Sequence, residues 1–278
     1  MNQKSYMYRE DEIRKYIPSS WSSHPEYRIV IFYEGFGKWF VGHGMKNVGA
    51  GDIVFIGPDT EEIFLNDSVF FENNDLRCCW SVLSFYDDIF PVNFRIMPEC
   101  DEIVSVLDKS RNGLLYHADE KLRQTLVALF DRFAGALGLN QILVLNEILL
   151  TLSRAGSGVQ VSPSKSDASA KEQLPVYRAF NYLLKNLSED IKLEGVASFA
   201  GQNASALCRS FKAATGQSIF SCLQELRLNQ ASRMLIESPL GIPQVAVECG
   251  FGSSTQFNRL FSKKMGIRAV DYRKLYQK

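Results

Sequence analysis

The stretch from Ile242 to Tyr272 reads IPQVAVECGFGSSTQFNRLFSKKMGIRAVDY and predicts two short helices joined by a tight turn. The apolar residues of its first part recur at the i, i+3, i+4, i+7 spacing of one helix face: Ile242, Val245, Ala246 and Cys249. The spacing breaks at residues 250–252, Gly-Phe-Gly, after which Ser253 can cap a second helix and Gly266 can end it.

The second helix, over about residues 254–265, has two chemically different sides. At 100° per residue, Phe257, Leu260 and Phe261 lie on the side expected to be buried. The opposite side carries Thr255, Asn258, Arg259 and Ser262. A short helix, a glycine turn and a second helix with outward polar groups are typical of a structure that reads the DNA major groove.

The same pattern occurs once before in the chain, which indicates an internal duplication. The first helix repeats at a constant offset of 49 positions, in Leu193, Val196, Ala197, Ala200 and Gly201. The second helix repeats at an offset of 50, in Leu207, Arg209, Phe211 and Gly216. Each copy has an arginine two residues after its anchoring apolar residue, so two reading helices are expected.

The segment between the two copies, residues 218–237, is rich in strong helix formers and predicts one connecting helix. At 1.5 Å per residue, roughly 19 residues give about 28 Å, near the roughly 34 Å of one DNA turn. The two pairs can therefore face successive segments of the major groove.

These segments resemble the DNA-binding domain of the AraC/XylS transcriptional regulators. The resemblance covers about the last hundred residues, through LCRSFKAATG, LRLNQASRML, ECGFGSSTQFNRLFSKKMG and DYRK. Three positions depart from the pattern of that family: Gly195 replaces a polar residue, Gln202 an apolar turn residue and Ala269 a proline. Because glycine weakens a helix by up to about 1 kcal/mol, the first pair is expected to be the less secure half.

The resemblance implies which side chains meet DNA. Base-reading side chains are expected at Ser205, Cys208, Arg209, Ser254, Thr255, Asn258 and Arg259. Arginine can bind guanine through two hydrogen bonds and asparagine prefers adenine, whereas serine, threonine and cysteine make adaptable or weak contacts. Phosphate contacts are expected from Lys212, Lys263 and Lys264. For each lysine the alternative is a solvated charge that stabilises the helix C-terminus.

The two halves of the chain differ in charge, although the whole is formally neutral. Residues 174–278 hold 14 Lys and Arg against 7 Asp and Glu, whereas residues 1–173 hold 17 against 24. A basic half suits a polyanion and an acidic half does not, so the halves are expected to have different partners.

We predict an α+β multidomain chain. Residues 1–155 are expected to form an effector-binding and dimerisation domain, and the Ser- and Gly-rich residues 156–173 a linker. Residues 174–278 are expected to form an all-α DNA-binding domain with two helix-turn-helix motifs joined by a long helix.

Short β-branched and aromatic runs dominate the N-terminal half. Strands are predicted over residues 27–33, 37–42, 52–57 and 77–85, and a short helix over residues 11–17. This half resembles the cupin-like sensor β-barrel that many AraC-type regulators carry, which implies a small-molecule effector. Four aromatic residues can line the effector pocket or form ordinary strand core: Tyr33, Trp39, Phe55 and Trp80.

Cupin enzymes hold a metal through histidines and a glutamate, whereas this chain has three histidines in separate segments, His24, His43 and His117. His24 with Glu26 is the nearest approach to a ligand pair, and Glu61 and Glu62 stand where such barrels often supply a histidine. Three scattered imidazoles are too few for a transition-metal site. We therefore expect no metal and no cofactor, with the histidines at the surface or hydrogen-bonded.

Two helical stripes follow the strands: Leu122, Leu126, Leu129, Phe130 and Phe133, then Ile142, Leu145, Ile148, Leu149 and Leu152. They predict an antiparallel helix hairpin. In the resembled family such helices often mediate dimerisation, which implies a homodimer through residues 119–154. Packing wholly within the domain is the alternative.

The location in the cell follows from composition and apolar runs. The six cysteines contain no CxxC pair and suit a reducing compartment. No signal peptide opens the chain, and the most apolar stretch, ILVLNEILLTL, is interrupted by Asn146 and Glu147. We expect a cytoplasmic protein without a membrane partner.

The favoured function is a sequence-specific transcriptional regulator, not an enzyme, controlled by a small molecule or partner bound in the N-terminal domain. RNA polymerase is a further partner if the protein is an activator. A cupin-type metalloenzyme with an incidental helical domain is one alternative, although it leaves the duplication unexplained. An architectural DNA-binding protein without an effector is another. The sequence specifies neither the effector, nor the operator, nor the direction of regulation.

Overall fold

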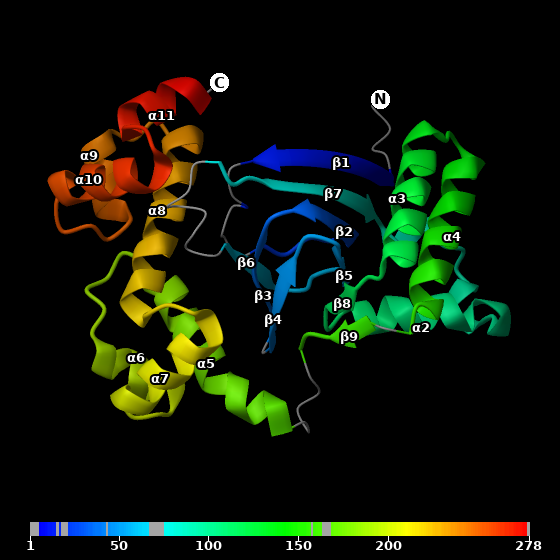
Figure 1. The fold of residues 1–278 in the computed structure, drawn as a ribbon, viewed down its shortest axis with the longest axis horizontal. Coiled ribbons are helices and arrows are strands. Elements are labelled where there is room, and N and C mark those ends of the chain that lie inside the picture. The colour runs from blue at the N-terminus through cyan, green and yellow to red at the C-terminus, as the bar shows by residue number, and fades with distance from the viewer. Residues whose placement is uncertain are drawn as a thin grey trace. The chain divides into compact units, whose positions relative to one another are not determined.

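The computed structural model describes residues 6–14, 17, 22–42, 44–66, 75–156, 158–162 and 168–276. These residues fall into two compact units, an N-terminal unit rich in strands and a C-terminal unit made of helices (Figure 1). This division into a β-rich unit with a helix hairpin and an all-α unit is the fold class that the sequence predicts.

Two antiparallel sheets build the N-terminal unit. The larger has the order β1-β7-β2-β5-β8-β9. Its strands are β1 (Met7–Arg14), β2 (Tyr27–Glu34), β5 (Asp52–Ile56), β7 (Cys78–Phe85), β8 (Leu114–His117) and β9 (Gly158–Gln160). The smaller sheet has the order β4-β3-β6, with β3 (Phe36–Val41), β4 (Gly44–Gly49) and β6 (Glu62–Asn66). Within the described residues, the ladders keep the sheets separate rather than closing them into one barrel.

The four predicted strands are confirmed as β2, β3, β5 and β7. The helix predicted over residues 11–17 is wrong, because residues 11–14 belong to β1, which pairs with β7 from Met7 opposite Phe85 to Arg14 opposite Cys78. This pairing joins residues about seventy positions apart, so a local window of sequence contains no sign of it. A ladder of backbone hydrogen bonds outweighs the weak helix propensity of the segment.

The predicted helix hairpin is present as α3 (Glu120–Gly135) and α4 (Leu139–Arg154), which run side by side (Figure 1). A preceding helix, α2 (Asp101–Ser110), packs on α4. The apolar stripes of these helices and one face of the larger sheet form a single core, which includes Ile31, Phe55, Leu83, Phe130 and Leu149. The helix stripes are thus buried within the domain, as the alternative interpretation expects.

The C-terminal unit consists of α5 (Ala168–Lys185), α6 (Leu193–Ala200), α7 (Ala204–Thr215), α8 (Ile219–Glu237), α9 (Ile242–Glu248), α10 (Ser254–Met265) and α11 (Ala269–Tyr276). The two predicted helix pairs are α6–α7 and α9–α10, and α8 is the predicted connecting helix. The helix α6 forms despite Gly195, where an added Cβ would lie 3.1 Å from the Tyr182 hydroxyl of α5.

The predicted linker, residues 156–173, contains more regular structure than its composition suggests. Its residues 158–160 form β9, and α5 begins at Ala168, whereas residues 157 and 163–167 lie outside the described part. The strand forms because Gly158 pairs opposite Tyr116, where a Cβ would come within 2.7 Å of the tyrosine ring. The exact division into domains remains a prediction.

A crowded glycine fixes the turn of the second helix pair. Gly250 has φ = 76°, a conformation that suits glycine, and an added Cβ would lie 2.3 Å from the Leu187 carbonyl oxygen and 2.8 Å from an Arg227 guanidinium nitrogen. Arg227 donates hydrogen bonds to the carbonyls of Leu187 and Glu189 at 2.7 and 2.6 Å. The turn is therefore packed directly on the segment between α5 and α6.

We predict that Gly250→Ala destabilises the C-terminal unit more than Gly216→Ala does. Gly216 has a similar φ of 78°, but no atom lies within 4 Å of its added Cβ, so it supplies the matched control. Left-handed backbone strain alone costs about 1 kcal/mol in Gly216→Ala. Crowding adds to that strain in Gly250→Ala, giving about 3 kcal/mol. Urea unfolding followed by far-ultraviolet circular dichroism measures both losses, and equal losses would contradict this account.

Candidate nucleic-acid interface

Side-chain caps and glycines set where the second helix of each pair begins and ends. Asn203 accepts a hydrogen bond from the Ala206 amide at the start of α7, and Ser253 accepts one from the Gln256 amide at the start of α10. Both helices end at a glycine in the left-handed conformation. For α10, the cap predicted at Ser253 and the end predicted at Gly266 are both confirmed.

Apolar residues on one side of α7 and α10 anchor the two helices. Leu207 and Phe211 of α7 and Phe257 and Phe261 of α10 are fully buried. Because these anchors occupy one side of each helix, the side chains on the opposite side project into solvent.

The predicted base-reading residues lie on this solvent side. All but one of the seven are exposed: Ser205, Cys208, Arg209, Thr255, Asn258 and Arg259. Ser254, in the first turn of α10, is half-buried. Six of the seven correspond in pairs at the offset of 50, Ser205 with Thr255, Cys208 with Asn258 and Arg209 with Arg259, whereas Ser254 corresponds to Ala204. The structure therefore presents two equivalent polar surfaces, and their contacts with bases remain predictions.

Arg209 and Arg259 differ from most arginines of the chain in having no local anion. Within the described residues, neither has a carboxylate oxygen within 4 Å, whereas Arg268 lies 2.7 Å from Asp271. An unpaired guanidinium on an exposed helix face is available to an external acceptor and would bind a base edge or a phosphate with charge-assisted hydrogen bonds.

The three predicted phosphate contacts divide into two kinds. Lys212 and Lys263 are exposed, as a phosphate contact requires. Lys264 is 7% exposed, and its Nζ lies 3.5 Å from Oε1 of the buried Glu225 in α8. The prediction for Lys264 is therefore wrong, because this ammonium lies inside the domain and links α10 to α8.

The buried carboxylate of Glu225 has a second polar neighbour. Gln217 donates a hydrogen bond to its Oε2 at 3.0 Å. Burial lowers the pKa of Lys264, and the Glu225 charge opposes that shift. Helical periodicity could have identified this lysine, because at 100° per residue it lies about 20° from Phe257 and about 140° from Arg259. Lys263, in contrast, lies about 40° from Arg259 on the exposed side.

The helix α8 separates the two pairs and is buried on several sides. Its buried residues include Ile219, Leu223, Leu226 and Leu235, and it contacts α5, α7, α9 and α11. Its last turn is also held by Arg273 of α11, which donates to the Leu235 carbonyl at 3.0 Å. A helix packed in this way acts as a spacer of fixed length, roughly 28 Å at 1.5 Å per residue.

The four aromatic residues predicted to line one effector pocket do not share one space. Phe55 lies in the core between the larger sheet and the helices, and Tyr33 packs against that core. Trp80 is on the opposite face of β7 from Leu83, which belongs to that core. Trp39 lies in the smaller sheet and donates a hydrogen bond to Glu62 at 2.5 Å. Alternation along the strands separates residues that composition alone groups together.

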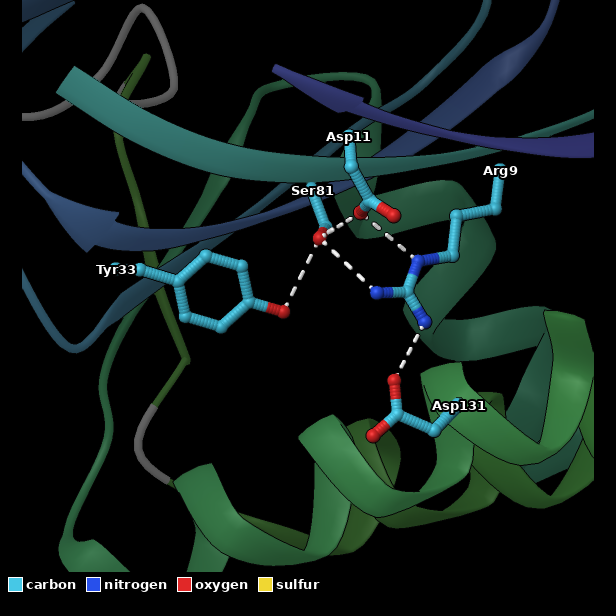
Figure 2. A network of polar contacts seen from close by, with 5 residues as sticks. All are labelled: Arg9, Asp11, Tyr33, Ser81 and Asp131. Atoms are coloured by element: carbon cyan, nitrogen blue, oxygen red, sulfur yellow. Dashed lines mark hydrogen bonds and ion pairs between the residues drawn. The ribbon is translucent and has the colours of Figure 1, made fainter. Parts of the chain in front are cut away.

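A polar network holds Tyr33 in place. Figure 2 shows its hydroxyl beside that of Ser81, with the two oxygens 3.1 Å apart; because Ser81 donates its single proton to Asp11, the Tyr33 hydroxyl is the donor to Ser81. Arg9 of β1 binds Asp11 at 3.0 Å and Asp131 of α3 at 2.8 Å. Since the network that starts at Ser81 joins β7 to β1 and α3, Tyr33 belongs to the structural connection between the edge of the sheet and the helices.

The carboxylates and imidazoles weighed as metal ligands have protein partners in most cases. Glu62 is buried, which raises its pKa, and its Oε1 lies 3.3 Å from an Arg28 nitrogen. His24 Nδ1 lies 3.8 Å from Glu26, and His117 Nδ1 lies 2.7 Å from Asp52. Glu61 is exposed, and His43 lies outside the described residues. No cluster of three or more His, Cys, Asp or Glu suited to a metal occurs in the described part of the chain.

No helix among the described residues is long and apolar enough to cross a membrane. The longest helix, α8, includes the buried polar residues Glu225, Asn229 and Ser232.

Comparison with known proteins places a helix-turn-helix domain over residues 196–275, which covers both helix pairs except the first three residues of α6. The chain is 23% identical to the HTH-type transcriptional activator RhaS of Yersinia pseudotuberculosis, over 90% of this chain and 87% of that protein. A solved transcriptional regulator of Chromobacterium violaceum, described by its AraC-type DNA-binding domain, is 26% identical, covering 38% of this chain and 96% of that one with a TM-score of 0.37. ToxT from Vibrio cholerae is 11% identical, with coverages of 98% and 99% and a TM-score of 0.42.

Two adjacent lysines allow surface and interior roles to be separated by one experiment. Lys263→Gln should reduce the steepness of the salt dependence of DNA binding by about one unit, because one phosphate contact contributes about 0.9. Lys264→Gln should leave that steepness unchanged but lower the free energy of unfolding by about 3 kcal/mol, because Glu225 then keeps a buried charge without its cation. DNA titrations at several salt concentrations and urea unfolding measure the two effects. A flatter salt dependence in Lys264→Gln would place that lysine on DNA.

Proposed function

Because the C-terminal half of this chain is the DNA-binding domain of an AraC-type transcriptional regulator, we propose that α7 and α10 read successive major-groove segments of one operator. The observation that carries the proposal is the matching exposure of Arg209 and Arg259 opposite fully buried anchors on two duplicated helices. The excess of basic residues over 174–278 adds the attraction to phosphate that brings such a surface to DNA.

Each reading helix has its own chemistry in this proposal. In α10, Arg259 binds guanine through two hydrogen bonds, Asn258 binds adenine, and Thr255 and Ser254 make adaptable contacts. In α7, Ser205, Cys208 and Arg209 occupy the equivalent surface, but Cys208 replaces the amide of Asn258 with a weak hydrogen-bonding group. The second pair therefore contributes more of the base discrimination than the first. Lys212 and Lys263 bind phosphate and position the domain.

The reading role of Arg259 can be tested on a duplex selected from random sequences by the purified protein. Arg259→Ala should weaken binding to the selected duplex by about 1 to 3 kcal/mol and relax the preference at one base pair. Arg209→Ala should cause a smaller loss of discrimination between bases, because the first helix pair contributes less of it. Titrations of selected and scrambled duplexes at two salt concentrations measure both.

Arg268→Ala supplies the control for a general loss of positive charge, since Arg268 is exposed and ion-paired with Asp271. This substitution should change the affinity for the selected duplex and for the scrambled duplex little. If Arg259→Ala weakens the selected and scrambled duplexes equally, Arg259 binds phosphate or supports the fold, and its base-reading role is refuted.

The N-terminal unit is the sensor in this proposal. Its net negative charge makes it unsuited to DNA, and its likeness to sensor domains of AraC-type regulators supports a small-molecule effector. An architectural DNA-binding protein would instead show no ligand-dependent change in DNA affinity. A thermal-shift screen of small metabolites on the full chain distinguishes the two: an effector raises the melting temperature and changes DNA affinity, and a screen without such a compound would count against the sensor.

A homodimer through α3 and α4 is part of the proposal. Because the main apolar stripes of both helices are buried within the domain, the dimer would use the outer residues, among which Leu139 and Leu143 of α4 are exposed. Sedimentation velocity of the full chain, alone and with DNA, tests this assembly. A monomer at tens of micromolar under both conditions would refute it.

The relative from Yersinia pseudotuberculosis is named a transcriptional activator, which supports activation as the direction of regulation here. An activator acts through RNA polymerase, so polymerase is the further protein partner and the cytoplasm is the compartment. The proposal assigns the chain no catalytic activity. Transcription in vitro from a promoter that carries the selected duplex tests the direction of regulation. Less transcript on adding the protein would show repression and contradict the proposed activation.

A further inference from the structure

A cavity of about 340 Å³ lies in the N-terminal unit where α2, β8, the end of α4 and the start of β9 meet. It is in the size range of small-molecule sites in proteins. It lies on the helix side of the larger sheet, whereas two of the aromatic residues expected to line the effector pocket, Trp39 and Trp80, do not belong to the core on that side. None of the four predicted pocket aromatics lines this cavity.

The floor of the cavity is apolar apart from the hydroxyl of one nearly fully buried tyrosine. Val106, Leu114 and Leu152 are nearly fully buried and supply the apolar surface. Tyr116 is 2% exposed and also lines the cavity, and its hydroxyl makes no hydrogen bond with any other described residue. Burial raises the pKa of Tyr116, so its phenol stays protonated and can donate a hydrogen bond.

Gly158, at the start of β9, keeps the cavity open beside Tyr116. An added Cβ would lie 2.7 Å from the tyrosine ring and 3.1 Å from its oxygen. A side chain at this position would therefore push against the ring and close the space above the phenol.

The rim carries a net positive charge. Lys109 of α2 is exposed, and within the described residues no carboxylate oxygen lies within 4 Å of its ammonium. Arg154 at the end of α4 lies 2.7 Å from Glu102, so that pair is neutral overall. The uncompensated charge of Lys109 gives the cavity a preference for an anion in an otherwise acidic half of the chain.

The geometry points to this cavity as the effector site, occupied by a small organic carboxylate with an apolar body. The carboxylate would bind Lys109 at the rim, the body would cover Val106, Leu114 and Leu152, and Tyr116 would donate to an oxygen of the ligand. The assignment of the ligand as an effector rests on the proposed function, whereas the binding site itself does not.

The position of the cavity also lets a bound ligand affect the segment that leads to the DNA-binding unit. Beyond β9, the Val161 amide donates to the Gly113 carbonyl at 2.8 Å and the Ser162 amide donates to the Asn112 carbonyl at 2.9 Å. These bonds extend the pairing of β9, which is the last described element before the helices of the DNA-binding unit. A ligand that binds better when β9 is paired stabilises that pairing, since a ligand favours the state for which it has the higher affinity.

The test uses the full chain and isothermal titration with 3-phenylpropanoate, its neutral amide 3-phenylpropanamide and inorganic phosphate. The acid should bind at least tenfold more tightly than either control, because only the acid combines a charge with an apolar body. Lys109→Gln should weaken acid binding at least tenfold, and Tyr116→Phe should weaken it severalfold while keeping the packing of the ring.

Lys121→Gln is the matched control, since Lys121 is an exposed lysine of α3 that does not line the cavity, and it should leave the acid affinity unchanged. Hydrogen exchange at the Val161 and Ser162 amides should slow when the acid is bound and not with the amide. The inference is overturned if the acid does not bind, if the amide or phosphate binds equally well, if Lys121→Gln weakens binding as much as Lys109→Gln, or if exchange at these amides is unchanged.

A DNA titration of the same variants separates this inference from the proposed function. Lys109→Gln and Tyr116→Phe without ligand should bind the selected duplex as the unsubstituted chain does. Loss of acid binding with retained DNA binding supports the cavity as a separate site. If the unsubstituted chain binds DNA normally but does not bind the acid, the cavity assignment is overturned and DNA recognition stands.

Discussion

The packing of α8 is the constraint on which DNA recognition depends. Two helix pairs joined by a flexible segment would find their groove positions independently, and each would lose orientational freedom on binding. Here α8 is buried against α5, α7, α9 and α11, and the Glu225–Lys264 pair ties its middle to α10. A buried pair of this kind contributes little net stability but strongly disfavours arrangements that separate its members. The spacing of the readers is thus a property of the folded domain.

The orientation of each reader has a local origin. A left-handed glycine reverses the chain, an Asn or Ser cap starts the second helix, and buried leucine or phenylalanine anchors turn its polar side outward. The turn of the second pair has an additional support, because Gly250 allows Arg227 to reach the Leu187 and Glu189 carbonyls. The second pair therefore has a support at its turn from Arg227, and the proposed function makes it the more selective of the two.

Local patterns predicted the helical half well, because caps, left-handed glycines and the 3.6-residue period are contained in short windows of sequence. Even there, the charge of Lys264 favours a phosphate contact, whereas its helical position places it beside Phe257. The strand half depends on pairing between distant segments, so the local pattern of residues 11–17 favours a helix where part of β1 forms. Composition likewise suggested one aromatic pocket where strand alternation separates Phe55 from Trp80. The cavity at Lys109 and Tyr116 is formed by elements that no sequence pattern brings together.

In the proposed function, one chain places two reading helices on one side of a duplex at a fixed separation. Hydroxyl-radical footprinting of the purified chain on its selected duplex measures this arrangement directly. We expect two protected segments whose centres lie about 10 base pairs apart on the same face, because the reading helices enter successive major-groove segments. A single protected segment, or two segments on opposite faces of the duplex, would contradict it.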